Sequence, residues 1–600
     1  MNDRRQLPEL LAAVEQRLLQ ARDGNPEALL DDGALADASA LLHAASAAKP
    51  GVLDVHPATL LALFHWFRYQ ALPAGENALD LYEALDYFAL LMDAVPEIAP
   101  APARLLTAGG RNGPAARAVR AVKEITRVGD REDTQALDAA IDALSAAIAA
   151  LPSGHPIRAD MQASLGVGYG WRYKHHGEIG DLERSITAIR QARTMQPPPT
   201  DIRVLLTSLG SVLLQRFQRL GTPADLDESI RALREAAKAP AVTPGSGAAT
   251  LTNLSLALQA RAEHIGGSVD QTGAVTAARQ AVQTSGADGA AQPLLYNNLV
   301  MVLSAEFRRA GDTALLDEAA EAGRQAIALT PASHPERPLI LRNLAAVLRA
   351  RAEQDSDAAG ADLDEAVEAA REAMLTTPTG SAAAARIAVG LLLALRVRHR
   401  RTDDGADIDE AVYVGRRCVE LLPPGHPDLA MALLDLGAVL TDRANRTGDR
   451  RDREESINRW STAAGSATAP AVHRLRAAHY AAQAIARLHR PQSASRAYAT
   501  ALDLLELTTW RGIGRADQLR LLQVETAGLA SDAASTAIAD GDPAAAVARL
   551  EQGRGVLWSQ LLATRTDLTR LEQADADLAR RMSACRAGLD QLGVVELENR

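Results

Sequence analysis

Asparagines at a constant spacing are the residues of this 600-residue chain that are best suited to binding chemistry. Asn253, Asn298 and Asn343 lie 45 residues apart, and each directly precedes a leucine. An amide donates and accepts hydrogen bonds at once, which suits an extended chain whose own N–H and C=O groups are unpaired. Asn297 and Arg342, one position earlier in their segments, would add polar and charged contacts. The series predicts a peptide-binding surface; the alternative is that these amides cap or bridge neighbouring helices.

The cysteines Cys418 and Cys585 are the candidates for nucleophilic catalysis, which would also require a partner histidine. Cys418 occupies a position where similar segments carry alanine, which indicates a buried small side chain. Cys585 lies in a helical pattern. The sequence contains no Gly-x4-Gly-Lys-Ser/Thr loop, His-Glu-x2-His, paired Cys-x2-Cys or Gly-x-Ser-x-Gly. We therefore expect no catalytic residue, no metal and no cofactor, and we keep a cysteine peptidase as an alternative.

A basic cluster from Arg396 to Arg401 suggests nucleic-acid binding, and a nucleic-acid-sensing adaptor is a further alternative. Similar clusters end other predicted helices, for example Arg172 to His176 and Arg443 to Arg446. Carbonyl groups at a helix C-terminus carry partial negative charge, so the helix dipole explains these positions better. The net charge of −11 also argues against a general nucleic-acid or anionic-membrane binder. We expect no nucleic-acid partner and no membrane partner.

A self-similar unit that returns every 44 to 47 residues contains all of these positions except Cys585. Small residues near the start of each second helix mark it. They are Ala140, Ser185, Ser229, Ala274, Ala319, Ala366, Ala411 and Ser456. Apolar residues in the middle of each first helix repeat in parallel. They are Leu165, Leu209, Leu254, Leu299, Leu344, Val389 and Leu436. A period in this range is typical of stacked helical hairpins, in which each unit contacts only its neighbours.

Two short patterns within the unit resemble the tetratricopeptide (TPR) repeat. Leu165-Gly166-x2-Tyr169 and Leu209-Gly210-x2-Leu213 match its first helix, and Ala319-x3-Gly323-x2-Ala326-x4-Pro331 matches its second. The unit has about 45 residues instead of 34, with the excess between the helices and after the proline. The resemblance implies an all-α, TPR-like α-solenoid, a superhelix of hairpins. It also implies that first-helix asparagines point into a concave groove and bind the backbone of a protein or peptide ligand.

Both ends of the chain resemble bacterial TPR proteins that carry a C-terminal CHAT domain. The N-terminal residues are Leu63 to Pro73 and Phe88 to Pro96, within the stretch from Val52 to Pro100; the C-terminal ones are Leu550 to Leu562, with Glu551-x-Gly553-Arg554-Gly555, and Arg565 to Leu568. CHAT domains are caspase-like cysteine-protease modules linked to bacterial defence. The resemblance implies a regulatory scaffold that controls such a protease, with a CHAT domain as a second partner. The chain itself shows no strand pattern or His-Gly element for that module after Gln560.

Domain boundaries follow from these patterns. We predict a helical cap region over residues 1–100, a TPR-like array of long repeats over 101–465, shorter TPR-like hairpins over 466–565, and a helix or linker over 566–600 that would precede a CHAT domain. Only 3% of residues are aromatic although 47% are hydrophobic, so the core must consist mainly of Ala, Leu and Val. The N-terminus lacks a signal-peptide pattern, and the longest apolar run, Ile387 to Leu395, is about half of the roughly 20 residues that a membrane helix needs. We expect a cytoplasmic protein.

Overall fold

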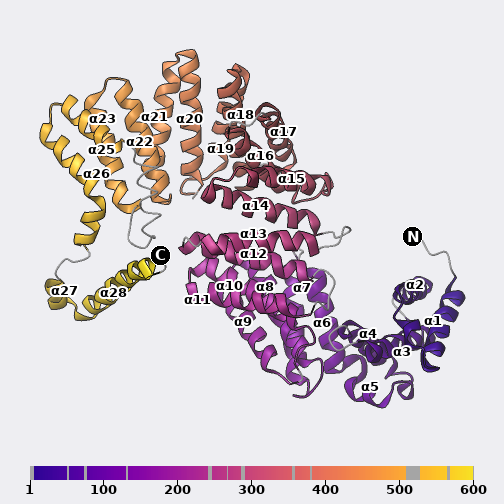
Figure 1. Cartoon of the computed structure of the whole chain (residues 1–600). Helices are drawn as coiled ribbons and strands as arrows, with labels where there is room; N and C mark the ends of the chain where they lie inside the picture. The colour runs from indigo at the N-terminus through magenta and orange to yellow at the C-terminus, as the bar shows by residue number, and fades with distance from the viewer. Residues whose placement is uncertain are drawn as a thin grey trace. The chain divides into compact units, whose positions relative to one another are not determined.

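Helices are the regular secondary structure of the described part of the chain. The computed structural model describes residues 6–49, 53–72, 77–129, 133–196, 198–240, 246–265, 268–284, 291–354, 358–378, 382–426, 428–508, 528–563 and 568–598, and no strand occurs within these ranges. Most helices pack as antiparallel pairs joined by short turns (Figure 1). The fold is an all-α, TPR-like α-solenoid, which confirms the predicted fold class.

The chain divides into two compact units, which are described separately. Unit 1 comprises Met1–Ala260 with Thr276–Gly289, and unit 2 comprises Arg261–Val275 with Ala290–Arg600. Unit 1 contains the helices α1 (Leu7–Arg22), η1 (Pro26–Leu29), α2 (Asp32–Ala48), α3 (Val55–Ala71), α4 (Ala78–Leu91), η2 (Pro96–Ile98), α5 (Ala101–Leu106), η3 (Gly110–Asn112), α6 (Pro114–Val128), α7 (Thr134–Ala150), α8 (Arg158–His176), α9 (Ile179–Thr194), α10 (Ile202–Leu220) and α11 (Pro223–Lys238). The helices α12 (Ser246–Ile265) and α13 (Ser268–Thr284) contribute residues to both units.

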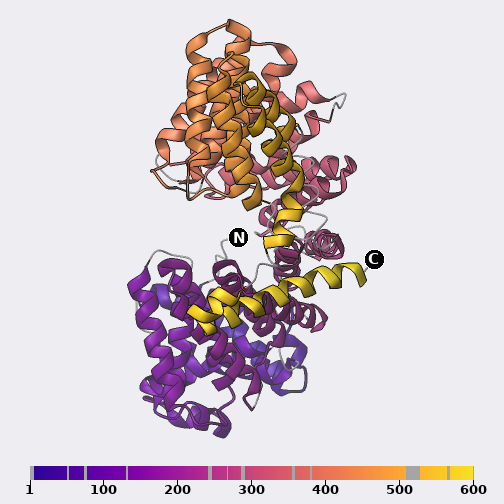
Figure 2. The same ribbon diagram turned by 90° about the vertical axis from the view of Figure 1, so that its left-hand side faces the viewer.

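Unit 2 continues the paired arrangement. Its helices are α14 (Gln292–Ala310), α15 (Ala314–Ala328), α16 (Arg337–Ala352), α17 (Ala359–Thr376), α18 (Ala382–Thr402), α19 (Gly405–Leu421), α20 (Leu429–Thr447), α21 (Arg450–Ala464), α22 (Ala471–Arg487), α23 (Pro491–Thr508), α25 (Leu529–Ala539), α26 (Pro543–Ala563), α27 (Thr569–Ala574) and α28 (Ala576–Glu598). Helices α20 to α23, drawn in orange, stand side by side in both views (Figures 1 and 2). The predicted boundaries at residues 100, 465 and 565 concern repeat length and stay a prediction.

The N-terminal part of unit 1 has an aromatic core and a buried polar network. Phe64 and Phe88 are fully buried, and Trp66 packs edge-on against Phe88. Arg68 of α3 donates to the carboxylate of Asp80 on α4 at 3.1 Å, and His65 lies 2.6 Å from the same carboxylate. These pairs fix α3 against α4 in the region predicted as a cap.

Small residues let the two helices of each pair approach closely, as the sequence predicts. All eight marker positions from Ala140 to Ser456 are buried. Ser185 and Ser229 also donate to the carbonyl oxygens of Gly166 and Gly210, at 2.7 and 2.6 Å. A Cβ atom at Gly166 would lie 2.6 Å from Cγ1 of Ile189, so the Leu-Gly pattern reflects helix contact.

The leucine series shifts by two residues in α18, where we expected Val389. A Cβ at Gly323 would meet Leu344, and one at Gly415 would meet Leu436, in each case 21 positions further on. The same offset from Ala370 leads to Leu391, which is 1% exposed, whereas Val389 is only half-buried. The physical reason is a longer turn between α16 and α17, which displaces every later unit by two residues. Leu391 therefore replaces Val389 in the series.

An arginine–aspartate pair joins the two helices of most of the repeated hairpins. The arginine lies seven residues after the marker leucine, and it binds an aspartate in the first turns of the second helix. The pairs are Arg172–Asp181, Arg216–Asp225, Arg261–Asp270, Arg351–Asp362, Arg398–Asp407 and Arg443–Asp452. All six aspartates are buried. The separation is 9 residues except in Arg351–Asp362, where it is 11 and records the longer turn.

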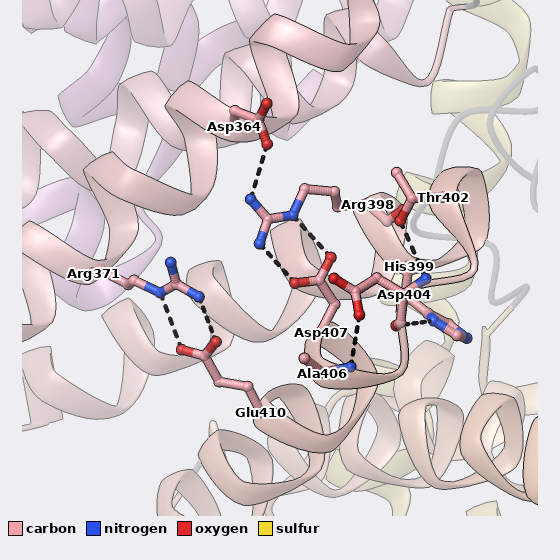
Figure 3. Close-up of polar contacts among 9 residues, drawn as sticks. All are labelled: Asp364, Arg371, Arg398, His399, Thr402, Asp404, Ala406, Asp407 and Glu410. Atoms are coloured by element: carbon pink, nitrogen blue, oxygen red, sulfur yellow. Dashed lines mark hydrogen bonds and ion pairs between the residues drawn. The ribbon is translucent and has the colours of Figure 1, made fainter.

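Most of these arginines also bind a carboxylate of the preceding helical hairpin. Arg398 donates from Nε and Nη2 to Asp407 at 2.8 and 2.6 Å, and from Nη1 to Asp364 of α17 at 2.9 Å (Figure 3). Asp407 is buried, whereas the Asp364 side chain is 68% exposed. Second helices are linked to each other as well, for example by Arg371 and Glu410 in the same view. One guanidinium thus fixes both the hairpin and its stacking.

Removing the buried carboxylate of this pair will destabilise unit 2 far more than removing the exposed one. We expect Asp407→Asn to lower the free energy of unfolding by about 3 kcal/mol, because it leaves the Arg398 charge partly buried without its bidentate partner. Asp364→Asn removes the same charge from the same arginine at an exposed position and will cost under about 1 kcal/mol. Urea unfolding followed by circular dichroism measures both; equal costs would contradict the argument.

Candidate functional site

The surface formed by the first helices of unit 2, α14, α16, α18 and α20, contains most of the predicted binding residues. We call it the first-helix surface. The position just before each marker leucine carries Asn298 in α14, Asn343 in α16, Gly390 in α18 and Asp435 in α20. Asn253 has the corresponding position in α12, where it is half-buried, and belongs to unit 1. The asparagine series thus ends at α16.

Asn343, Asn297 and Arg342 form one hydrogen-bonded chain across two first helices. The Nδ2 atom of Asn343 donates to Oδ1 of Asn297 at 2.8 Å, and Nη2 of Arg342 donates to Oδ1 of Asn343 at 3.0 Å. Asn297 and Asn298 are each only 6% exposed. Asn343 therefore bridges α16 and α14, which is the structural alternative that the sequence left open. Its contact with a ligand stays a prediction.

Arg342 extends from α16 toward Gly390 of α18. The Cγ atom of Arg342 lies 3.6 Å from the place where a Cβ of Gly390 would be. Burial lowers the pKa of the Arg342 guanidinium, and the nearby positive charge of Arg386 lowers it further. Arg386 itself is exposed. Two cationic groups from adjacent first helices therefore face the same region.

A cavity of about 240 Å³ lies beside these two arginines. Its apolar lining comes from α18, α19 and α20, with residues Ala385, Val389, Cys418, Leu422 and Met431. Arg342, Arg386 and Asp428 supply its charged lining. Val389 is half-buried in this lining, while the buried Leu391 holds the marker position of the same helix. The structure thus combines an apolar cavity with hydrogen-bonding groups on one surface.

Cys418 forms part of the cavity lining and is not a reactive thiol. It is 1% exposed, its Sγ lies 3.3 Å from the carbonyl oxygen of Ala385, and burial raises its pKa to about 12, with Asp435 and Asp428 adding to the shift. A thiol with such a pKa holds almost no thiolate near neutral pH. Cys585 on α28 is exposed.

Alkylation will therefore distinguish the two cysteines. At pH 8 we expect iodoacetamide to modify Cys585 in the folded chain and to leave Cys418 unmodified, because Cys418 is both buried and protonated. Both should react after denaturation. Peptide mass spectrometry identifies the modified residue, and rapid modification of Cys418 in the folded protein would restore it as a candidate nucleophile.

Asp435 is a carboxylate in an environment that favours its neutral form. Burial raises its pKa from 3.8 to about 6, although the charges of Arg396, Arg349 and Arg476 act in the opposite direction. Since the folded-state pKa exceeds the unfolded one, the charged form costs stability above about pH 4, and the cost is complete above pH 6.

Replacing this carboxylate with a neutral amide should stabilise the protein at neutral pH. We expect Asp435→Asn to raise the free energy of unfolding by about 2 kcal/mol at pH 7.5, and the gain to shrink toward zero as the pH falls from 6 to 4. Thermal unfolding of both proteins over this pH range measures the difference. A gain that is constant with pH would assign the effect to packing instead.

Carboxylates bind Arg396, Arg398 and Arg400 of the basic cluster from Arg396 to Arg401. Arg396 and Arg400 both bind Asp442, at 2.6 and 3.0 Å, and Arg398 binds Asp407 and Asp364. His399 lies 2.6 Å from the carbonyl oxygen of Asp404 (Figure 3). The helix dipole therefore explains these positions incompletely, because specific ion pairs hold most of the charges.

The described ranges offer neither a metal site nor a membrane-spanning helix. They hold no group of three His, Cys, Asp or Glu side chains arranged to bind a metal ion. None of the helices in those ranges combines the length and the apolar character needed to cross a membrane. Among the residues that carry the CHAT resemblance, Val52, Pro73 and Arg565 to Asp567 lie outside the described residues.

Arg386, Asp428 and Asp435 are site residues that the sequence reasoning missed. The sequence analysis singled out none of the three, and Asp435 occupies the position that carries asparagine in α14 and α16. The sequence does indicate the correct register of α18. In every repeat that has the arginine–aspartate pair, the arginine follows the marker leucine by seven residues. Counting back from Arg398 gives Leu391, and hence the correct position for Gly390.

Comparison with known proteins gives similarity in structure only. No protein-family profile matches the sequence, and no curated protein matches it either. A human IFIT1 dimer with PPP-AAAA has a TM-score of 0.36 at 12% identity, covering 80% of this chain and 94% of that one. Yeast Tom70 has a TM-score of 0.34 at 12% identity, covering 92% and 99%. Naa15/Naa10 bound to HypK-THB has a TM-score of 0.22 at 14% identity, covering 96% and 81%. The function must therefore be inferred from this chain's own residues.

Proposed function

We propose that this chain is a scaffold that binds a segment of a partner protein on the first-helix surface of unit 2. The observation that carries the proposal is the apolar cavity beside the hydrogen-bonded chain of Arg342, Asn343 and Asn297. An extended peptide needs both features, because its backbone requires hydrogen-bonding partners and its side chains require apolar contact. Asn298 completes the proposed set in unit 2, and a binding role for Asn253 of unit 1 stays a separate prediction.

The proposal also names the class of partner protein. The Glu551-x-Gly553-Arg554-Gly555 segment, which lies in α26, resembles the region that precedes a CHAT domain. It supports a role as the sensor or regulatory part of a caspase-like protease system in bacterial defence or signalling, in the cytoplasm. The coding sequence around this segment tests the assignment. A strand-rich domain with a His and a Cys, encoded downstream or in an adjacent gene, supports it, and an unrelated neighbour contradicts it.

Peptide selection tests the scaffold itself. We expect a displayed library of random 12-residue peptides to yield binders to the full chain, and Asn343→Ala to weaken a synthetic binder about fivefold, which corresponds to the loss of one net hydrogen bond. Asn458→Ala, at an exposed position of α21, is the matched control and should leave binding unchanged. Fluorescence anisotropy measures the affinities.

Two outcomes would count against this proposal. The recovery of no peptide, or of peptides insensitive to Asn343→Ala, removes the first-helix surface as the site. Tight binding of single-stranded RNA that weakens steeply between 50 and 200 mM salt would favour the nucleic-acid alternative. We expect no such binding, because Asp442, Asp407 and Asp364 already hold the arginines of the cluster.

A further inference from the structure

Arg342 and Arg386 differ from the other arginines of the first-helix surface in their partners. Arg351, Arg398 and Arg443 each bind two carboxylates, and Arg396 binds Asp442. Arg342 donates to the Asn343 amide instead, and Arg386 makes no ion pair with any residue that the structure describes. The surface therefore has two positive charges that the described part of the chain does not neutralise.

These two charges lie close enough to repel each other. The positive charge of Arg386 contributes to the lowered pKa of Arg342, and the half-buried position of Arg342 weakens the screening by water. A negative group placed between them would relieve the repulsion and would accept hydrogen bonds from both guanidinium groups. The charge complement of this place is a carboxylate.

Apolar side chains form the other wall of the same cavity. Ala385, Val389, Leu422 and Met431 present carbon atoms, and the flexible Met431 can adapt to different apolar shapes. A volume of about 240 Å³ leaves space for more than a water molecule or a single carboxylate. The carboxylate and an apolar group must therefore enter together, from neighbouring residues of one ligand.

Asp428 restricts the charge pattern of that ligand. It lines the cavity together with the two arginines, but it forms no ion pair with them. A run of acidic residues would place a second negative charge near Asp428, which is unfavourable, whereas one acidic residue avoids it. First helices continue on both sides of the cavity, α14 beyond α16 and α22 beyond α20, so a chain can pass through without ending there.

From this arrangement, we propose that the cavity between α16, α18 and α20 recognises one Asp or Glu side chain directly beside one apolar side chain, within an internal segment of the partner protein. The inference depends on the proposed scaffold function and specifies the chemistry of its ligand. Arg342 and Arg386 hold the carboxylate, the apolar wall holds the neighbouring side chain, and Asp428 excludes polyacidic segments.

Four displayed libraries test this specificity with the full chain. Each carries 12-residue peptides whose C-termini are fused to the display protein, and the fixed central dipeptides are Glu-Leu, Gln-Leu, Lys-Leu and Glu-Gly. We expect the Glu-Leu library to be recovered at least about tenfold more than the others. In a synthetic, amidated Glu-Leu peptide, Glu→Gln should weaken binding about tenfold to the native chain but less than twofold to the Arg386→Gln chain.

Charge reversal keeps the test independent of folding defects, because Arg386 is exposed. The Arg386→Glu chain should prefer the Lys-Leu peptide, and the control Arg417→Gln, at an exposed position of α19, should behave as the native chain. Equal recovery from all four libraries would overturn the inference and leave the scaffold function in place. Recovery from none would overturn the scaffold function as well. Binding that requires a free terminal carboxylate would also overturn the inference in favour of a chain-end site.

Discussion

The arginine–aspartate pair found in most of the hairpins is the interaction on which their stacking depends. Two N–H groups of its guanidinium bind the two oxygens of a carboxylate at the start of the second helix. This bidentate pair fixes the register of the two helices. A third N–H group reaches the preceding unit in Arg172, Arg216, Arg351, Arg398 and Arg443. Alanine-rich seams supply contact but little directional preference, since small apolar side chains tolerate sliding. The planar, bidentate pair supplies the direction.

The pair of α14 and α15 shows that charge balance matters more than the identity of the residues. Glu306 stands seven residues after Leu299, where the other units have arginine, and Leu315 stands where they have the buried aspartate. Both members of the pair have changed together. Glu306 is buried and binds Arg309 of its own helix at 2.9 Å, so its charge is compensated locally. A lone arginine or aspartate at this place would have left a buried charge without a partner, which costs several kcal/mol.

The sequence predicted the fold well because the core repeats. The small residues from Ala140 to Ser456 are constrained by helix contact in every unit, so their period is visible without a structure. The site was predictable only in part. Asn343, Asn297 and Arg342 were identified by their positions, and the structure brings these three together, but it also joins them to each other. The cavity was not predictable, because its lining combines side chains of α16, α18, α19 and α20 whose proximity no single position of the repeat reveals.

The paired charges tolerate the two-residue insertion between α16 and α17. The ion pair absorbs the insertion, since Arg351 still binds Asp362 across the longer turn, and the leucine series resumes at Leu391. The position before that leucine takes no part in the ion pair, and it changes from Asn343 in α16 to Gly390 in α18. Arg342 passes this glycine in ordinary van der Waals contact, and Arg386 and Val389 of the same helix border the cavity. A repeat whose interior is fixed by paired charges can therefore alter its outer surface one residue at a time, which is how a regular array acquires a single specific binding site.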